Sequence, residues 1–134
     1  MVQFSTLERD YLLDPLAVND LAPLAPFFSQ PGIEKVFHAA EYDLLCLRRD
    51  YGFEFANLFD TMIAARILGR EAVGLGSILE IEFGVHLNKR FQRANWGQRP
   101  LPADLLNVLD ILSYRQLLMT EAAVRKAEEI WGKN

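Results

Sequence analysis

Three segments of the sequence contain side chains that can take part in catalysis, metal binding or ligand binding. The first, Lys35-Val-Phe-His-Ala-Ala-Glu-Tyr-Asp43, places a histidine and an aspartate where a predicted strand ends and a helix begins. An aspartate just past the carboxyl end of a strand is well placed to hold a cation in the crevice of an α/β fold. The plainer interpretations are that Asp43 is a first-turn acid favoured by the helix dipole, and that His38 is a strand-end histidine bonded to backbone. The residue types alone favour these plainer interpretations.

The second segment is Asn57-Leu-Phe-Asp-Thr-Met-Ile-Ala-Ala-Arg66. Asp60 and Thr61 have side chains that can act in catalysis, but both are also good helix-capping residues. On their chemistry alone we favour capping.

The third segment runs from Lys89 to Leu101 and contains four cations (Lys89, Arg90, Arg93 and Arg99), no acid, and Phe91 and Trp96 between them. A loop of this kind can contact phosphates and stack a base. It can equally be a solvated basic surface loop with Trp96 packed inward. The residues leave both interpretations open.

The predicted secondary structure around these three segments alternates between strand and helix. Short β-rich runs at 2–6 and 10–14 predict a hairpin, and 84–101 reads mostly as loop. Leu44, Leu45 and Leu47 are expected to face inward from the second helix. The other predicted elements are a helix over 19–29 weakened by Pro23 and Pro26, a strand over 33–38, a helix over 40–51 closed by Gly52, a short strand over 57–59, helices over 61–68 and 74–83, and a helix from Pro102 to the end.

Composition limits the classes of protein that fit. A chain of 134 residues that is 51% apolar and 24% charged can build one globular domain. No apolar run reaches the roughly 18–20 residues of a membrane helix, and no signal peptide is recognisable, so no membrane role is expected. The single cysteine, Cys46, excludes an internal disulfide, and a reducing cytoplasmic location is expected. The net charge of −4 argues against holding nucleic acid by bulk electrostatics alone.

The segments, in this order, resemble the ribonuclease D-like 3′–5′ exonuclease domain of the DEDD superfamily. The likeness covers about residues 2–107 and rests on Val-Gln-Phe-Ser-Thr, Asp-Tyr-Leu-Leu-Asp-Pro-Leu, Glu-Lys-Val-Phe-His-Ala-Ala-Glu-Tyr-Asp, Asn-Leu-Phe-Asp-Thr-Met, Gly-Leu-Gly-Ser-Ile-Leu and Trp-Gly-Gln-Arg-Pro-Leu. The resemblance implies an α/β, ribonuclease H-like fold, a mixed sheet flanked by helices. We therefore expect a partial exonuclease domain over 1–107, followed by a long C-terminal helix of unclear origin over 108–134.

In the family, four acids hold two divalent metal ions, Mg²⁺ or Mn²⁺, which activate water and stabilise the leaving oxygen of a phosphodiester. The resemblance places the third acid at Asp43. For the fourth, in a late helix, Asp110 is the candidate. If the protein acts on nucleic acid, we expect His38, Arg90, Arg93, Trp96 and Arg99 to contact the 3′ end of single-stranded RNA or DNA.

The sequence departs from the family pattern in two places. The Asp-x-Glu strand that should precede Val2 has no counterpart. The family's Tyr-x-x-x-Asp is also missing, because Leu106 stands four residues before Asp110 and the nearest tyrosine, Tyr114, follows the acid. Because one or two carboxylates cannot hold two metal ions about 3.5–4 Å apart, we expect at most residual nuclease activity.

The absent Asp-x-Glu strand would be the central first strand of the family's sheet, so unpaired backbone would flank its place. The neighbouring strands could then pair directly, a second copy could donate an element in a swapped dimer, or part of the chain could stay disordered. The apolar stripe of the tail, Leu117, Val124 and Trp131, favours a homo-oligomer.

Three functions therefore compete: an impaired nuclease that acts on nucleic-acid 3′ ends, a non-catalytic or engineered recombinant fragment that only folds and self-associates, and a nucleic-acid-binding module without chemistry.

Overall fold

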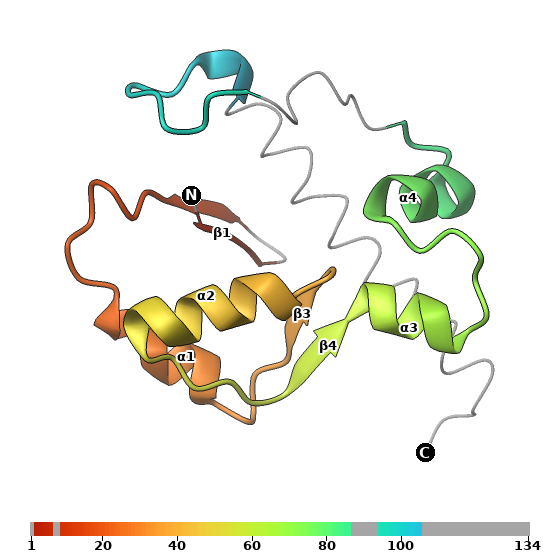
Figure 1. Cartoon of the computed structure of the whole chain (residues 1–134), viewed down its shortest axis with the longest axis horizontal. Helices are drawn as coiled ribbons and strands as arrows, with labels where there is room; N and C mark the ends of the chain where they lie inside the picture. Colours follow the sequence, from red (N-terminus) through yellow and green to blue (C-terminus); the bar gives the residue numbers. More distant parts are fainter. Residues whose placement is uncertain (1, 7–8, 87–93, 106–134) are drawn as a thin grey trace. The chain divides into compact units, whose positions relative to one another are not determined.

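A computed structural model describes residues 2–6, 9–86 and 94–105. The chain divides into two compact units, one formed by residues 16–75 and the other by residues 1–15 together with 76–134. Within the described residues the elements are β1 (Val2–Ser5), β2 (Asp10–Leu13), η1 (Ala22–Leu24), α1 (Ala25–Ser29), β3 (Lys35–Phe37), α2 (Glu41–Tyr51), β4 (Leu58–Asp60), α3 (Thr61–Ile67) and α4 (Leu75–Phe83), shown in Figure 1.

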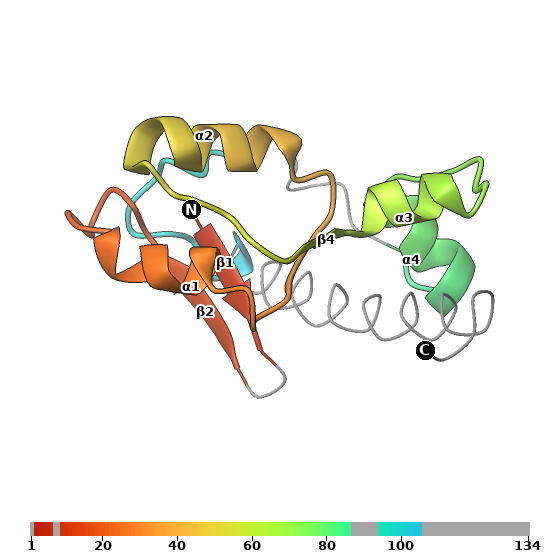
Figure 2. The ribbon, with the colours of Figure 1, turned by 90° about the horizontal axis from the view of Figure 1, so that it is seen from below.

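The predicted N-terminal hairpin is confirmed. β1 pairs antiparallel with β2, so that Val2 lies opposite Leu13 (Figure 2). Thr6 and Arg9 hold the two sides of the connection, because the Thr6 N–H donates to the Arg9 carbonyl at 2.8 Å and the Arg9 N–H donates to Thr6 Oγ1 at 3.0 Å. In the same unit, α4 ends where Gly84 takes a φ of 63°, and Leu79 is buried.

The unit of residues 16–75 is built on two parallel strands. β3 and β4 pair with Lys35 opposite Leu58 and Phe37 opposite Asp60. Because parallel strands have their carboxyl ends at the same edge, α2 and α3 both begin at that edge, as Figure 1 shows. This edge holds the side chains of the first two segments singled out in the sequence.

Aromatic side chains form the core of this unit. The ring of Phe28 lies 5.3 Å from that of Phe53 and 5.3 Å from that of Phe55, centroid to centroid. Phe53 and Phe28 are both almost fully buried. Buried with them is Lys35, whose Nζ donates to the carbonyls of Gln30 at 2.6 Å and Ile33 at 2.7 Å, so its ammonium group is paired with backbone.

Helix α2 matches the predicted helix closely. It ends at Gly52, which adopts the left-handed conformation and donates its N–H to the Arg48 carbonyl at 2.9 Å. Leu44 and Leu47 are partly buried as predicted, but the prediction for Leu45 was wrong, because its side chain is 60% exposed. The reason is angular: at about 100° per residue, Leu45 lies far around the helix from the line joining Leu44 and Leu47.

The helix predicted over 19–29 is replaced by two short helices, η1 and α1. Each contains a proline near its start, Pro23 in η1 and Pro26 in α1. A proline is tolerated in the first turn, where its missing N–H has no intrahelical partner, and it breaks a helix further in. Asp20, which stands just before η1, accepts the Ala22 N–H at 2.8 Å.

Of the predicted C-terminal helix, residues 103–105 are helical, and the rest of that prediction lies outside the described residues. None of the helices in the described ranges has the length and apolar character needed to span a bilayer.

Candidate functional site

The carboxylate of Asp60 ties together the two helix starts at the edge of the β3–β4 pair. As predicted, it caps α3: Oδ1 accepts the N–H groups of Met62 at 2.8 Å and Ile63 at 3.2 Å. It also reaches the β3–α2 turn, where Oδ1 accepts the Ala39 N–H at 3.1 Å and Oδ2 the Ala40 N–H at 2.8 Å. Partial burial alone would raise the pKa of Asp60, but the four N–H donors outweigh it and lower the pKa below its ordinary value.

The hydroxyl of Thr61 determines the tautomer of His38. Thr61 Oγ1 donates its one proton to the Phe37 carbonyl at 3.0 Å, and His38 Nδ1 lies 2.8 Å from the same oxygen. Nδ1 must therefore be the donor, which leaves Nε2 of the neutral ring as an acceptor. Burial lowers the pKa of His38, and the nearby charge of Asp60 opposes this only in part, so the ring is neutral at pH 7.

The turn between β3 and α2 holds Asp43 in the first turn of α2. Ala39 has a φ of 58°, a left-handed conformation that costs a non-glycine residue free energy and that the bond to Asp60 supports. Ala40 follows as the cap residue of α2, with Asp43 three residues further on. The Asp43 side chain is exposed.

The described residues supply an incomplete set of ligands for a pair of divalent metal ions. Asp43 is an accessible carboxylate of the kind that Mg²⁺ and Mn²⁺ prefer. Within residues 2–6, 9–86 and 94–105, however, no three His, Cys, Asp or Glu side chains come together in a way that could hold a metal ion. Asp110, the second predicted ligand, lies outside the described residues. The residues seen here therefore fit one ligand position and do not fit a complete two-metal site.

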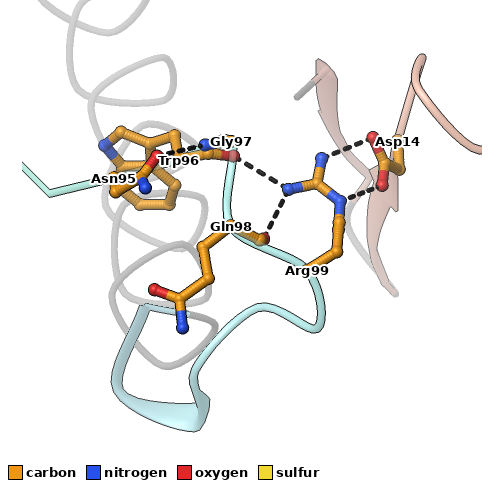
Figure 3. A network of polar contacts seen from close by, with 6 residues as sticks. All are labelled: Asp14, Asn95, Trp96, Gly97, Gln98 and Arg99. Carbon is orange, nitrogen blue, oxygen red and sulfur yellow. Dashed lines mark hydrogen bonds and ion pairs between the residues drawn. The ribbon is translucent and has the colours of Figure 1, made fainter.

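The basic loop is described from residue 94 onward, so Arg90 and Arg93 lie outside the described residues. Trp96 is half-buried. Arg99 forms a bidentate ion pair with Asp14, from Nε to Oδ2 and from Nη2 to Oδ1, the latter at 2.6 Å (Figure 3). Nη1 of Arg99 also donates to the carbonyls of Trp96 at 2.9 Å and Gln98 at 2.8 Å.

Two partners were missed by the analysis of the sequence. Asp14 stands 85 residues from Arg99, and no local pattern relates the two. The second role of Asp60, at Ala39 and Ala40, depends on the parallel pairing of β3 with β4. The sequence did contain one signal for this role: Asp60 ends a strand, and two parallel neighbouring strands have their carboxyl ends at the same edge of a sheet.

Comparison with protein families gives a match to a family described as 3′-5′ exonuclease, over residues 1–107. Among curated proteins, the chain is 41% identical over 107 residues to Protein RRP6-like 3 of Arabidopsis thaliana. That match covers 79% of this chain and 12% of the relative, so the chain spans only a small part of the relative's length.

Two solved structures are similar over most of the chain. The catalytic core of RRP6 from Trypanosoma brucei is 35% identical with a TM-score of 0.84, covering 90% of this chain and 34% of that one. RNase D of Escherichia coli, described as an exoribonuclease involved in structured RNA processing, is 30% identical with a TM-score of 0.86, covering 95% of this chain and 34% of that one. These likenesses confirm the predicted α/β, ribonuclease H-like class of fold.

Proposed function

Since the chain belongs to the 3′–5′ exonuclease family, as the sequence predicted, we propose that it recognises the 3′ end of single-stranded RNA as part of a ribonuclease D-like domain. The observation that carries the proposal is the family match over residues 1–107, a range that includes Asp43 on the first turn of α2. RNA is favoured over DNA because RNase D, one of the similar solved structures, is an exoribonuclease.

We propose Asp43 as a ligand of a Mg²⁺ or Mn²⁺ ion and Asp110 as a second ligand. When bound, such an ion would stabilise negative charge on phosphate oxygens. The assignment is supported by the exposed carboxylate of Asp43, which follows closely on a turn whose Ala39 and Ala40 N–H groups are bonded by Asp60. The test is Mn²⁺ binding: paramagnetic broadening of amide signals in the first turn of α2 should be present in the wild type and lost in Asp43→Asn. Asp50→Asn, which removes an exposed acid from the last turn of the same helix, is the matched control.

The residues that we propose as RNA contacts are His38, Arg90, Arg93 and Trp96. A neutral His38 whose Nε2 is an acceptor suits a sugar hydroxyl better than a phosphate. The two arginines suit phosphates, and Trp96 suits a base.

The 134 residues by themselves are proposed to have at most residual nuclease activity. Two facts support this: the sequence contains no Asp-x-Glu, and the described residues contain no group of three His, Cys, Asp or Glu side chains that could hold a metal ion. A 3′-end degradation assay on a short single-stranded RNA with Mg²⁺ or Mn²⁺ tests it. Brisk metal-dependent degradation that Asp43→Asn abolishes and Asp50→Asn leaves intact would show that the residues suffice for catalysis.

A second candidate function is self-association of a non-catalytic or recombinant fragment. The fragment would then form a homo-oligomer, for example a domain-swapped dimer. It is favoured by Ile63 and Ile67, which lie four residues apart on α3 and are 52% and 67% exposed. Light scattering should then give at least a dimer mass, which Ile63→Lys with Ile67→Lys reduces. A monomer mass at high protein concentration argues against this candidate, and a salt-dependent oligonucleotide shift supports the RNA-binding proposal instead.

A further inference from the structure

Arg99 is engaged with this protein's own groups through most of its hydrogen-bonding capacity. A guanidinium has five N–H donors, and four of them are used here, two on the Asp14 carboxylate and two on the carbonyls of Trp96 and Gln98. The ion pair is sheltered, since the Arg99 and Asp14 side chains are only 31% and 22% exposed. The hydrogen bond to Asp14 raises the pKa of Arg99 above its already high value, so the charge is permanent.

The carbonyls that Arg99 holds belong to the turn that presents Trp96. Two bonds from Asn95 complete the turn: its Oδ1 accepts the Gly97 N–H at 3.1 Å and its carbonyl accepts the Gln98 N–H at 3.2 Å. Figure 3 shows the Trp96 indole on the side of this turn away from Asp14, with the guanidinium between the turn and the end of β2. Arg99 therefore links the position of Trp96 to the hairpin and keeps its own donors away from the indole side.

From this geometry we propose that Arg99 is a positioning residue, clamped by Asp14, that fixes the Trp96 turn for stacking against a base of bound RNA. The part of this inference that concerns RNA rests on the proposed function. It gives Arg99 a different task from the phosphate contact expected of a basic loop, because a phosphate would have to displace Asp14 from an already bidentate pair. A phosphate contact and a clamp make opposite predictions for substitutions of Asp14.

The test uses the full chain with Trp131→Phe, so that Trp96 is the one tryptophan left. Asp14→Asn and Arg99→Gln are compared with Asp104→Asn and Arg9→Gln, which remove an exposed acid and an exposed base of the same unit. Without RNA, acrylamide quenching of Trp96 fluorescence should increase in both clamp variants and stay unchanged in both controls. Unchanged quenching in Asp14→Asn and Arg99→Gln overturns the clamp, whatever the RNA results are.

Binding to a short single-stranded RNA is then measured over a range of salt concentrations. If Arg99 is a clamp, both clamp variants should lose about tenfold in RNA affinity, which is the size of one lost base stack. The double variant should bind no more weakly than either single variant. The slope of log affinity against log salt concentration should stay that of the wild type. A phosphate contact predicts a slope lower by about 0.7 in Arg99→Gln and no loss in Asp14→Asn, which would overturn the inference.

The failure of the proposed function gives a different result. If the wild type binds no RNA while quenching rises in the clamp variants, Arg99 still fixes the turn, and its role toward RNA is refuted together with the proposed function. Arg99→Lys guards against misfolding: it keeps the charge and loses the bidentate geometry, so it should resemble Arg99→Gln in quenching while retaining the wild-type circular dichroism spectrum.

Discussion

Replacing Asp60 by alanine tests whether one carboxylate joins two helix starts. Its bonds to Met62 and Ile63 form an ordinary N-cap, the loss of which costs about 1 kcal/mol. Its bonds to Ala39 and Ala40 lie across the strand pair, one exposed and one partly buried, and because solvent weakens them they add roughly 0.5–1 kcal/mol each. We therefore expect Asp60→Ala to lower the free energy of unfolding by about 2–3 kcal/mol.

Asp20→Ala is the matched control for this substitution. Asp20 is an exposed aspartate that accepts a backbone N–H of one segment, that of Ala22. Its loss should cost about 0.5–1 kcal/mol, the net contribution of one ordinary hydrogen bond. The assay is urea unfolding followed by circular dichroism, with equal slopes as the condition for comparing midpoints. Equal losses for the two variants would refute the claim that Asp60 joins α2 to α3.

Three further predictions concern the same edge. The pKa of Asp60 in the folded protein lies below its ordinary value of 3.8, so the ionised side chain stabilises the fold above that pH, and this stabilisation is lost as the pH falls through the folded pKa. The difference in free energy of unfolding between the wild type and Asp60→Asn, measured by urea unfolding, should therefore become smaller below about pH 3.8. A difference that does not change with pH would contradict this. Thr61→Val should lower the free energy of unfolding by about 1–3 kcal/mol in the same urea experiment, because it removes the hydroxyl that bonds the Phe37 carbonyl and His38 Nδ1. An unchanged free energy of unfolding would mean that these bonds are dispensable. Ala39→Gly should stabilise the protein by roughly 0.5–1 kcal/mol, seen as a higher melting temperature, because glycine adopts the left-handed φ of 58° without strain. This relief of strain should exceed the cost of the larger conformational entropy that glycine has in the unfolded chain. A lower melting temperature would argue against strain at Ala39.

Local patterns were enough to predict most of the elements and the capping role of Asp60. The hairpin of β1 and β2, the end of α2 at Gly52, and the start of α3 after Asp60 all depend on residues within a few positions of one another. Each of these features is governed by backbone hydrogen bonds and turn conformation that a short stretch of sequence sets. The same patterns were insufficient at residues 19–29, where Pro23 and Pro26 split the predicted helix in two, and at Leu45, whose exposure depends on which side of α2 the core lies.

The family was also predictable from the sequence, because a run of short motifs in a fixed order is specific even where each motif alone is ambiguous, whereas Asp43 as a metal ligand stays a prediction. Contacts between residues that are distant in the sequence became known only from the folded structure. The parallel pairing of β3 and β4 brings Asp60 to Ala39 and Thr61 to His38, and the fold of the other unit brings Arg99 to Asp14 across 85 residues. The physical reason is that such bonds depend on the path of the chain through space, which leaves no regular spacing between the residues that form them.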